Sequence, residues 1–316
     1  MKTTSTLIPV LLVCLCLTGC NALQKLFLGK KETPPAADFT KVAQPTLEQI
    51  TSTINRNSQN IRNFSTANAS IRIPGALIAL RSQLTFERPK RLRIQGSAST
   101  LTGQEFDFGS NDTIFWLWAR RDTDEMWYCR HDLYPLSPIR SFIPIDPDWL
   151  LEALGIVEFK PTDQHFGPTR MADKNWEIIS HCQMPSGQYI KRTVIDSKTG
   201  WIKRQELYTP QSELIALAES SDWRFDRGTN VSYAKQITVQ CQGMDGTMTI
   251  DLGSPTFNAS ASFATSMFTM PTFPGYRAVD LSSPEFLQPR GVVMPTQMPN
   301  MTGAPVPEAN IQTVVR

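Results

Sequence analysis

The sequence lacks the residue patterns of the common catalytic centres. It contains no G-x-S-x-G, G-x-x-x-x-G-K-[ST], G-x-G-x-x-G or H-E-x-x-H motif. Only three of its 316 residues are histidines, and each stands alone: His131, His165 and His181. An isolated histidine is more often a structural residue than a base or a metal ligand. We therefore expect no enzyme, and no catalytic residue, metal site or cofactor.

The chain also lacks an excess of charge of one sign. Its 31 basic and 29 acidic residues are spread along the sequence. Binding to nucleic acid requires a clustered positive surface, and binding to a strongly charged partner requires a comparable imbalance. These partner classes are not expected, and an apolar ligand is the better match.

Cysteines are few, and none has the spacing of a metal site. Of the six, Cys14 and Cys16 lie in an apolar run near the amino terminus. Beyond Cys20, three remain, with no CxxC or Cys/His pattern typical of zinc: Cys129, Cys182 and Cys241. A disulfide between Cys182 and Cys241 could form outside the cytoplasm, and the sequence leaves this pairing open.

The one strongly apolar run is at the amino terminus, where residues 7–17 follow Lys2. With about eleven residues it is shorter than the roughly 20 that a spanning helix needs. It ends in the four residues of a bacterial lipobox: Leu17, Thr18, Gly19 and Cys20. Small side chains suit the cleavage site, and a thiol can carry diacylglycerol. Residues 1–19 are therefore predicted to be a lipoprotein signal peptide; the alternative is an ordinary signal peptide that happens to contain a cysteine.

A lipid on Cys20 would anchor the mature protein without a transmembrane helix. Two or three chains such as palmitate hold a protein stably, because each buried CH₂ contributes about 0.8 kcal/mol. In enteric bacteria an aspartate after the lipidated cysteine retains a lipoprotein in the inner membrane, and this chain has Asn21. The predicted location is thus the cell envelope, on the outer membrane facing the periplasm. Residues 20–45 are predicted to be a lipidated flexible tether.

Hydrophobic periodicity predicts a mainly β domain with two helices. Thr46 and Gln49 form a capping box at the start of an amphipathic helix over 46–64, and a short apolar helix is expected over 145–156. Residues 276–316, rich in Pro and Met, are predicted to be disordered. Strands are expected at 69–73, 77–87, 91–96, 106–108, 113–119, 126–130, 175–182, 188–196, 201–208, 231–241 and 246–252.

Two of these strands carry more aromatic residues than one buried face requires. Phe115-Trp116-Leu117-Trp118 and Trp127-Tyr128 place apolar groups on both faces. One face could pack on a helix while the other lines a cavity, or protein could cover the strand on both faces. The first alternative provides a site for acyl chains, which bind by burial of apolar area.

The order of elements resembles the LolA/LolB superfamily of lipoprotein carriers and receptors over about residues 46–275. The resemblance rests on the amino-terminal helix, the phrase Phe86-Glu87-Arg88-Pro89-Lys90-Arg91-Leu92-Arg93-Ile94, the strand 111–118, the midchain apolar helix and the hairpin at Asp196-Ser197-Lys198-Thr199-Gly200. It implies an incomplete antiparallel β-barrel, a curved sheet whose apolar concave face is lidded by helices. Because soluble carriers lack a lipobox, the lipid-anchored outer-membrane receptor type, LolB, is the closer comparison.

The resemblance also implies roles for individual residues. Leu101, in the stretch 99–108, matches the leucine of the receptor's protruding loop, which pushes cargo chains toward the membrane; the alternative is a leucine packed at the strand end. The residues expected to line the acyl cavity are Ile71, Ile73, Leu84, Phe86, Leu92, Ile94, Phe106, Phe108, Trp116, Trp118, Trp149 and Leu150.

The sequence therefore predicts a lipid-anchored lipoprotein that binds acyl chains and catalyses no reaction. It would accept lipoproteins or lipids, with a soluble periplasmic carrier as a possible donor, and insert them in the outer membrane. The alternative is an envelope sensor or scaffold that uses the same fold to bind a protein or a mislocalised lipid, since a fold alone does not assign a function.

Overall fold

The computed structural model describes residues 33–75, 78–99, 103–120, 124–141, 147–184, 187–259 and 262–287. The predicted signal peptide, the lipobox with Cys20, Leu101 and the end of the chain from 288 lie outside these residues.

The first long element, α2 (Leu47–Gln59), follows the short η1 (Asp38–Lys41). Its predicted capping box is confirmed: the Gln49 amide donates to Thr46 Oγ1 (3.2 Å), and the Thr46 amide donates to Gln49 Oε1 (2.9 Å). The helix ends five residues before the predicted 64. Arg88 terminates it by donating to the carbonyls of Ser58 and Ile61, both at 2.9 Å.

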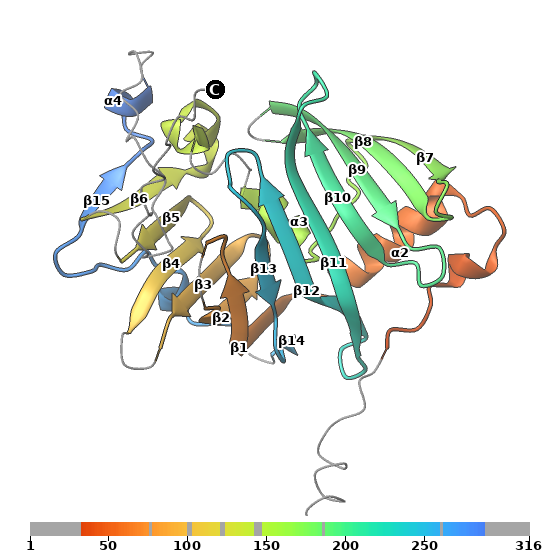
Figure 1. The fold of residues 1–316 in the computed structure, drawn as a ribbon, viewed down its shortest axis with the longest axis horizontal. Helices are drawn as coiled ribbons and strands as arrows, with labels where there is room; N and C mark the ends of the chain where they lie inside the picture. The colour runs from red at the N-terminus through yellow and green to blue at the C-terminus, as the bar shows by residue number, and fades with distance from the viewer. Residues whose placement is uncertain are drawn as a thin grey trace, which may run out of the picture.

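Among the described residues, fifteen strands form one sheet (Figure 1). They are β1 Asn63–Arg72, β2 Leu80–Glu87, β3 Arg91–Ser97, β4 Gln104–Ser110, β5 Ile114–Ala119, β6 Glu125–Arg130, β7 Gln164–Arg170, β8 Trp176–Met184, β9 Gly187–Ile195, β10 Ile202–Tyr208, β11 Leu214–Asp226, β12 Val231–Cys241, β13 Met248–Asp251, β14 Thr256–Phe257 and β15 Arg277–Asp280.

The strand order is β15-β6-β5-β4-β3-β2-β1-β13-β12-β11-β10-β9-β8-β7, and β14 pairs with β1. All pairs are antiparallel except β15 with β6. The sheet is strongly curved, and its end strands β15 and β7 do not pair with each other. The predicted fold class, a mainly β incomplete barrel with helices, is confirmed.

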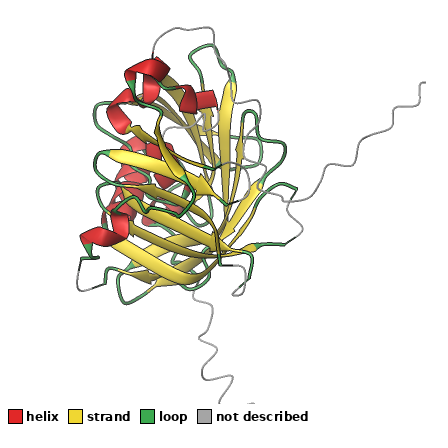
Figure 2. Cartoon of the chain, turned by 90° about the vertical axis from the view of Figure 1, so that its left-hand side faces the viewer, coloured by secondary structure: helices red, strands yellow, loops and turns green. Residues whose placement is uncertain are grey.

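Most of the helical segments gather on the concave side of this sheet (Figure 2). One apolar cluster joins α2 to β8, β9 and β10, and a second holds α3 (Pro147–Ala153) against strands of both halves. A third cluster lies between β5, β6 and two short segments, η2 (His131–Leu136) and η3 (Pro138–Ser141). The concave face thus has three separate covers.

The fold continues past residue 275, where we expected the domain to end. Before that residue, η4 (Thr265–Phe268) packs on β3; beyond it, β15 adds to the sheet edge and α4 (Pro284–Leu287) follows. The Ser137 hydroxyl donates to the Leu281 carbonyl at 2.7 Å, which fixes this segment to the loop after η2. These residues alternate weakly in hydrophobicity, so composition alone favoured disorder.

Candidate functional site: the concave apolar face under α3

The concave face of the sheet carries a large apolar cluster. Ten of the twelve residues predicted to line a cavity pack in one cluster: Ile71, Ile73, Leu84, Phe86, Leu92, Ile94, Phe106, Phe108, Trp149 and Leu150. Leu207, Ala216, Val239 and Ile250 extend the cluster across the other half of the sheet. Residues from β1–β4 and from β10–β13 therefore meet over the same face.

Trp116 and Trp118 do not belong to this face, contrary to the prediction. Cross-strand pairing places Ile94 opposite Phe108, and Phe108 opposite Leu117, so Leu117 shares the concave face. Because side chains alternate along a strand, both tryptophans point to the convex side. There they pack with Met126 in a separate cluster.

The carboxyl-terminal segment covers these convex aromatic residues. The Phe273 ring stacks on Trp118 with centroids 3.8 Å apart, and Tyr276 meets the same indole edge-on at 5.2 Å. Of the two explanations for the aromatic surplus in this strand, coverage by protein on both faces is the one that the structure shows.

Two glycines make room for the large rings on opposite faces. A Cβ on Gly96 would lie 1.9 Å from the Phe106 ring, and one on Gly109 would lie 2.0 Å from the Trp116 ring. Each glycine stands directly opposite the aromatic residue in the adjacent strand. The rings can therefore lie flat along the sheet at these two positions.

The helix α3 fills the middle of the concave face. Trp149 is fully buried, and Leu151, Ala153 and Leu154 are nearly so. A helix of seven residues is not stable on its own, so α3 depends on these contacts for its structure. The Trp149 indole N–H is buried without a hydrogen-bond partner among the described residues.

One buried ion pair links α3 to the sheet. Lys191 Nζ of β9 lies 2.7 Å from Glu152 Oε2 of α3, and the lysine side chain is only 2% exposed. Burial alone lowers the pKa of Lys191, but the Glu152 carboxylate outweighs it and holds that pKa above its ordinary value. Gln205 Nε2 of β10 donates to the Glu152 backbone carbonyl at 3.1 Å.

By contrast, α2 is fixed by two bidentate backbone contacts. The Asn55 side chain donates to the Phe159 carbonyl (2.9 Å) and accepts from the Phe159 amide (2.8 Å). Asn57 makes the same pair of bonds with Ser232, both at 2.8 Å. The described contacts of α3 are instead buried apolar side chains, the Lys191–Glu152 ion pair and the Gln205 hydrogen bond.

The three cysteines that the structure describes are free, so it shows no disulfide between Cys182 and Cys241. Cys129 and Cys182 are buried, and Cys241 is half-buried. Burial raises the pKa of each thiol to about 11. Cys182 belongs to the concave cluster, whereas Cys129 lies under η2 and η3.

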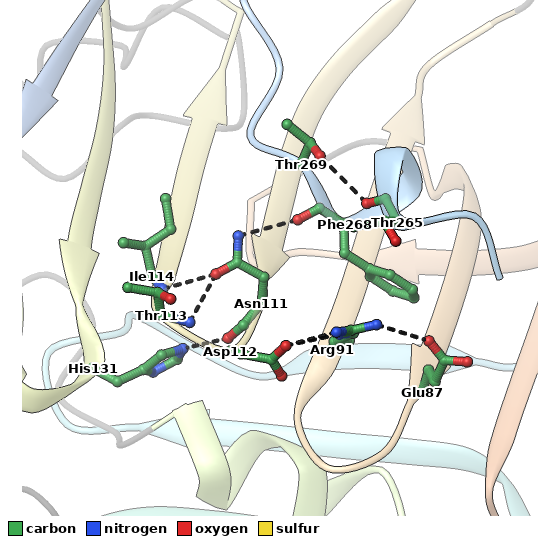
Figure 3. A network of polar contacts seen from close by, with 10 residues as sticks. All are labelled: Glu87, Arg91, Asn111, Asp112, Thr113, Ile114, His131, Thr265, Phe268 and Thr269. Atoms are coloured by element: carbon green, nitrogen blue, oxygen red, sulfur yellow. Dashed lines mark hydrogen bonds and ion pairs between the residues drawn. The ribbon is translucent and has the colours of Figure 1, made fainter. Parts of the chain in front are cut away.

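A pocket of about 460 Å³ lies at the turn between β4 and β5, and its lining is polar, unlike that of the apolar face. It is lined by Lys90, Asp112, Thr113, Arg130, His131 and Asp132. Figure 3 shows its network: His131 Nε2 lies 2.9 Å from the Asn111 carbonyl, and Asn111 Nδ2 donates to the Phe268 carbonyl at 3.1 Å. The network joins the turn to η4. Ser110 Oγ also lies 3.3 Å from His131 Nε2, the nitrogen that faces the Asn111 carbonyl.

No group of three or more His, Cys, Asp or Glu side chains within the described part of the chain could hold a metal ion. Over the same residues, no helix has the length and apolar character needed to cross a membrane.

Several solved structures are similar to this chain. A LolA superfamily protein from Nitrosomonas europaea is 10% identical, with a TM-score of 0.44 over 70% of this chain and 97% of its own. A DUF1329 family protein from Desulfovibrio piger is 13% identical, with a TM-score of 0.48 over 75% and 100%. A candidate outer membrane lipoprotein-sorting protein domain from Vibrio parahaemolyticus is 8% identical, with a TM-score of 0.47 over 68% and 93%.

The resemblance is one of fold. No protein-family profile and no curated protein matches the chain.

Proposed function

We propose that this protein binds acyl chains of lipoproteins or lipids on the concave face of its sheet, and inserts its cargo in the outer membrane. The observation that carries the proposal is the apolar cluster that spans both sheet halves, covered by the short helix α3. Acyl chains need apolar area and no directed bonds, and this face offers it.

Binding on this face requires α3 to move, since Trp149 and its neighbours occupy the middle of the surface. An entering chain replaces the apolar contacts of α3 with its own, at about 0.8 kcal/mol for each CH₂ buried. The process is an exchange of one apolar environment for another. Its direction is set by the relative affinities of donor, protein and membrane, and a soluble periplasmic carrier would be a suitable donor.

The lipid on Cys20 would keep the domain beside the membrane that receives the cargo. The domain itself begins where Ala37 and Phe39 pack against the turn at Gly200, and the Ala37 amide donates to the Thr199 carbonyl at 2.9 Å. A chain of 16 residues, 21–36, reaches at most roughly 60 Å. Ala37, where the folded domain begins, would therefore stay within that distance of the bilayer.

Photo-crosslinking in cells tests the binding face. A benzophenone amino acid is placed at Phe108 on the concave face or at Tyr128 on the convex face; both residues are half-buried aromatics. We expect acylated protein or lipid adducts from position 108 and few from position 128, measured by mass spectrometry of the labelled peptide. Equal adducts at both positions, or adducts only with this chain's own Cys20 lipid, would contradict the proposal. A protein adduct without acyl chains would favour a scaffold.

The loop between β3 and β4 is proposed to deliver the cargo through Leu101. Leu101→Glu should leave the free energy of unfolding almost unchanged, because the substitution falls between two strands and not within one, and should reduce transfer of a labelled lipoprotein to liposomes. Thr102→Glu is the matched control and should transfer normally. Normal transfer by Leu101→Glu would remove the loop from the mechanism.

A further inference from the structure

A cation is buried beneath α3, where binding of a neutral acyl chain needs none. Lys191 lies on the concave side of β9, flanked by the Phe159 ring, whose centroid is 5.7 Å from Nζ, and by Leu207 in the adjacent strand. The ion pair that the structure shows for it is with Glu152 of α3. A buried charge is costly unless it is paired, so any group that replaces α3 must also provide a partner for Lys191.

Two further polar groups lie on the same face beside Lys191. Thr193 follows two residues along β9, and Gln205 stands directly opposite it in β10. Both residues are at most 1% exposed, and Thr193 Oγ1 and Gln205 Oε1 have no hydrogen-bond partner among the described residues. Pairing within the sheet thus brings an ammonium, a hydroxyl and an amide together.

Movement of α3 removes the partners that this group now has. Glu152 leaves with the helix, and so does the backbone carbonyl that accepts from Gln205 Nε2. Lys191 would then be a buried charge without a counter-ion, a strongly unfavourable state. The three vacated or unused donors, Lys191 Nζ, Thr193 Oγ1 and Gln205 Nε2, match the acceptors of a carboxylate or phosphate.

We propose that the ligand of the concave face is an anionic amphiphile, whose carboxylate or phosphate head replaces Glu152 at Lys191, Thr193 and Gln205 while its chain lies on the apolar cluster. The inference rests on the proposed acyl-binding function and specifies its ligand class. A neutral ester- or amide-linked chain would leave Lys191 unpaired and bind more weakly.

Calorimetric titration of the full-length protein with matched probes tests the ligand class. Palmitate and hexadecyl phosphate carry the anionic head, hexadecanol has a comparable chain without charge, and acetate and inorganic phosphate carry charge without a chain. We expect both anionic amphiphiles to bind at least about tenfold tighter than hexadecanol, as charge-assisted hydrogen bonds provide, and the two free anions to bind far more weakly.

A double variant, Lys191→Met with Glu152→Leu, removes the pair together and should lose the preference for palmitate while still binding hexadecanol. Arg192→Met is the matched control: it removes a cation from the next residue, which pairs with Glu177 and Glu206 on the other face, and should keep the preference.

Equal affinity of the wild-type protein for palmitate and hexadecanol would overturn the inference and leave the proposed function standing. Binding of acetate or phosphate as tight as that of the amphiphiles would also overturn it. Failure of all three long-chain probes to bind would contradict acyl binding itself. The wild-type comparison needs no variant, so it decides even if the double variant does not fold.

Discussion

At the scale of single residues, one buried carboxylate organises the convex side of β3, β4 and β5. Asp107 is fully buried and accepts from Trp116 Nε1 (2.9 Å), Gln104 Nε2 (2.7 Å) and Arg93 Nη2 (2.9 Å). These bonds orient the Trp116 indole over Gly109 and fix the arginine along the sheet. The polar cluster thereby holds the aromatic face that the carboxyl-terminal segment covers.

Replacing Asp107 should therefore destabilise the protein strongly. Asp107→Ala leaves the Arg93 guanidinium, whose side chain is only 14% exposed, without its counter-ion, and should lower the free energy of unfolding by about 3 kcal/mol. Asp132→Ala removes the partner of Arg130 from an exposed pair and should have no measurable effect. Urea denaturation measures both, and an equal loss in the two variants would refute this assignment.

His131 should make stability depend on pH. Burial, with the Lys90 charge nearby, lowers the pKa of His131 below its ordinary 6.5. The unfolded chain then binds more protons than the folded one, so stability present above pH 6.5 is lost as the pH falls toward the folded pKa. The unfolding free energy should drop less between pH 7.5 and 5.5 in His131→Gln than in wild type. The same drop in both proteins would show that His131 does not contribute.

The sequence identifies which residues are apolar better than it identifies the face to which they point. In β5 every position from Phe115 to Trp118 is apolar, so alternation carries no information, and the register with β4 decides. The polar group at Lys191 and Thr193 escaped prediction for a related reason. Tyr189-Ile190-Lys191-Arg192-Thr193-Val194 mixes polar and apolar residues on both faces.

At the scale of elements, the covers of the concave face differ in how they are attached. Bidentate asparagine contacts hold α2, whereas α3 relies on buried apolar side chains, one ion pair and a Gln205 hydrogen bond. A native thiol, that of Cys182, can report on the opening of α3. The Cys182 sulfhydryl lies in the concave cluster, close enough to Glu152 for its charge to raise the thiol's pKa, after the larger effect of burial.

Weakening the ion pair should expose this thiol. Because burial raises the pKa of Cys182 to about 11, little thiolate exists at neutral pH and reaction with N-ethylmaleimide should be slow. Glu152→Gln removes the counter-charge of Lys191 and one cause of the raised Cys182 pKa, and should increase the rate of labelling at Cys182 both by opening α3 more often and by yielding more thiolate. Peptide mapping provides the internal control: Cys129, under η2 and η3, should keep its rate. Faster labelling of both cysteines would indicate general unfolding instead.

Elements with strong local signals could be predicted from the sequence, and those fixed by distant contacts could not. The start of α2 follows from the Thr46 capping box, but its end depends on Arg88, far along the chain. β7 and β11 were missed because polar residues, such as Glu219-Ser220-Ser221-Asp222, interrupt the alternation of apolar and polar positions. Their pairing with neighbouring strands stabilises them instead.

At the scale of the whole molecule, the two sheet halves share one apolar face, and the chain's ends are fixed elsewhere. Ala37 and Phe39 pack at the turn before β10, while residues from Phe273 to Leu281 cover the convex side and edge of β5 and β6. Neither end of the described chain covers the concave cluster. The middle of that face is left to α3, which is the arrangement that a removable cover requires.

The central claim is that an acyl chain lies on the concave face and not on the convex one. Methyl NMR of the full-length protein with isoleucine labels tests it, using stearate that carries a nitroxide near its methyl end. The account predicts that signals of Ile71 and Ile94, on the concave face, broaden beyond detection while that of Ile114, packed on the convex side, persists. Broadening of Ile114 with Ile71 and Ile94 unchanged, or equal loss of all three, would contradict the account.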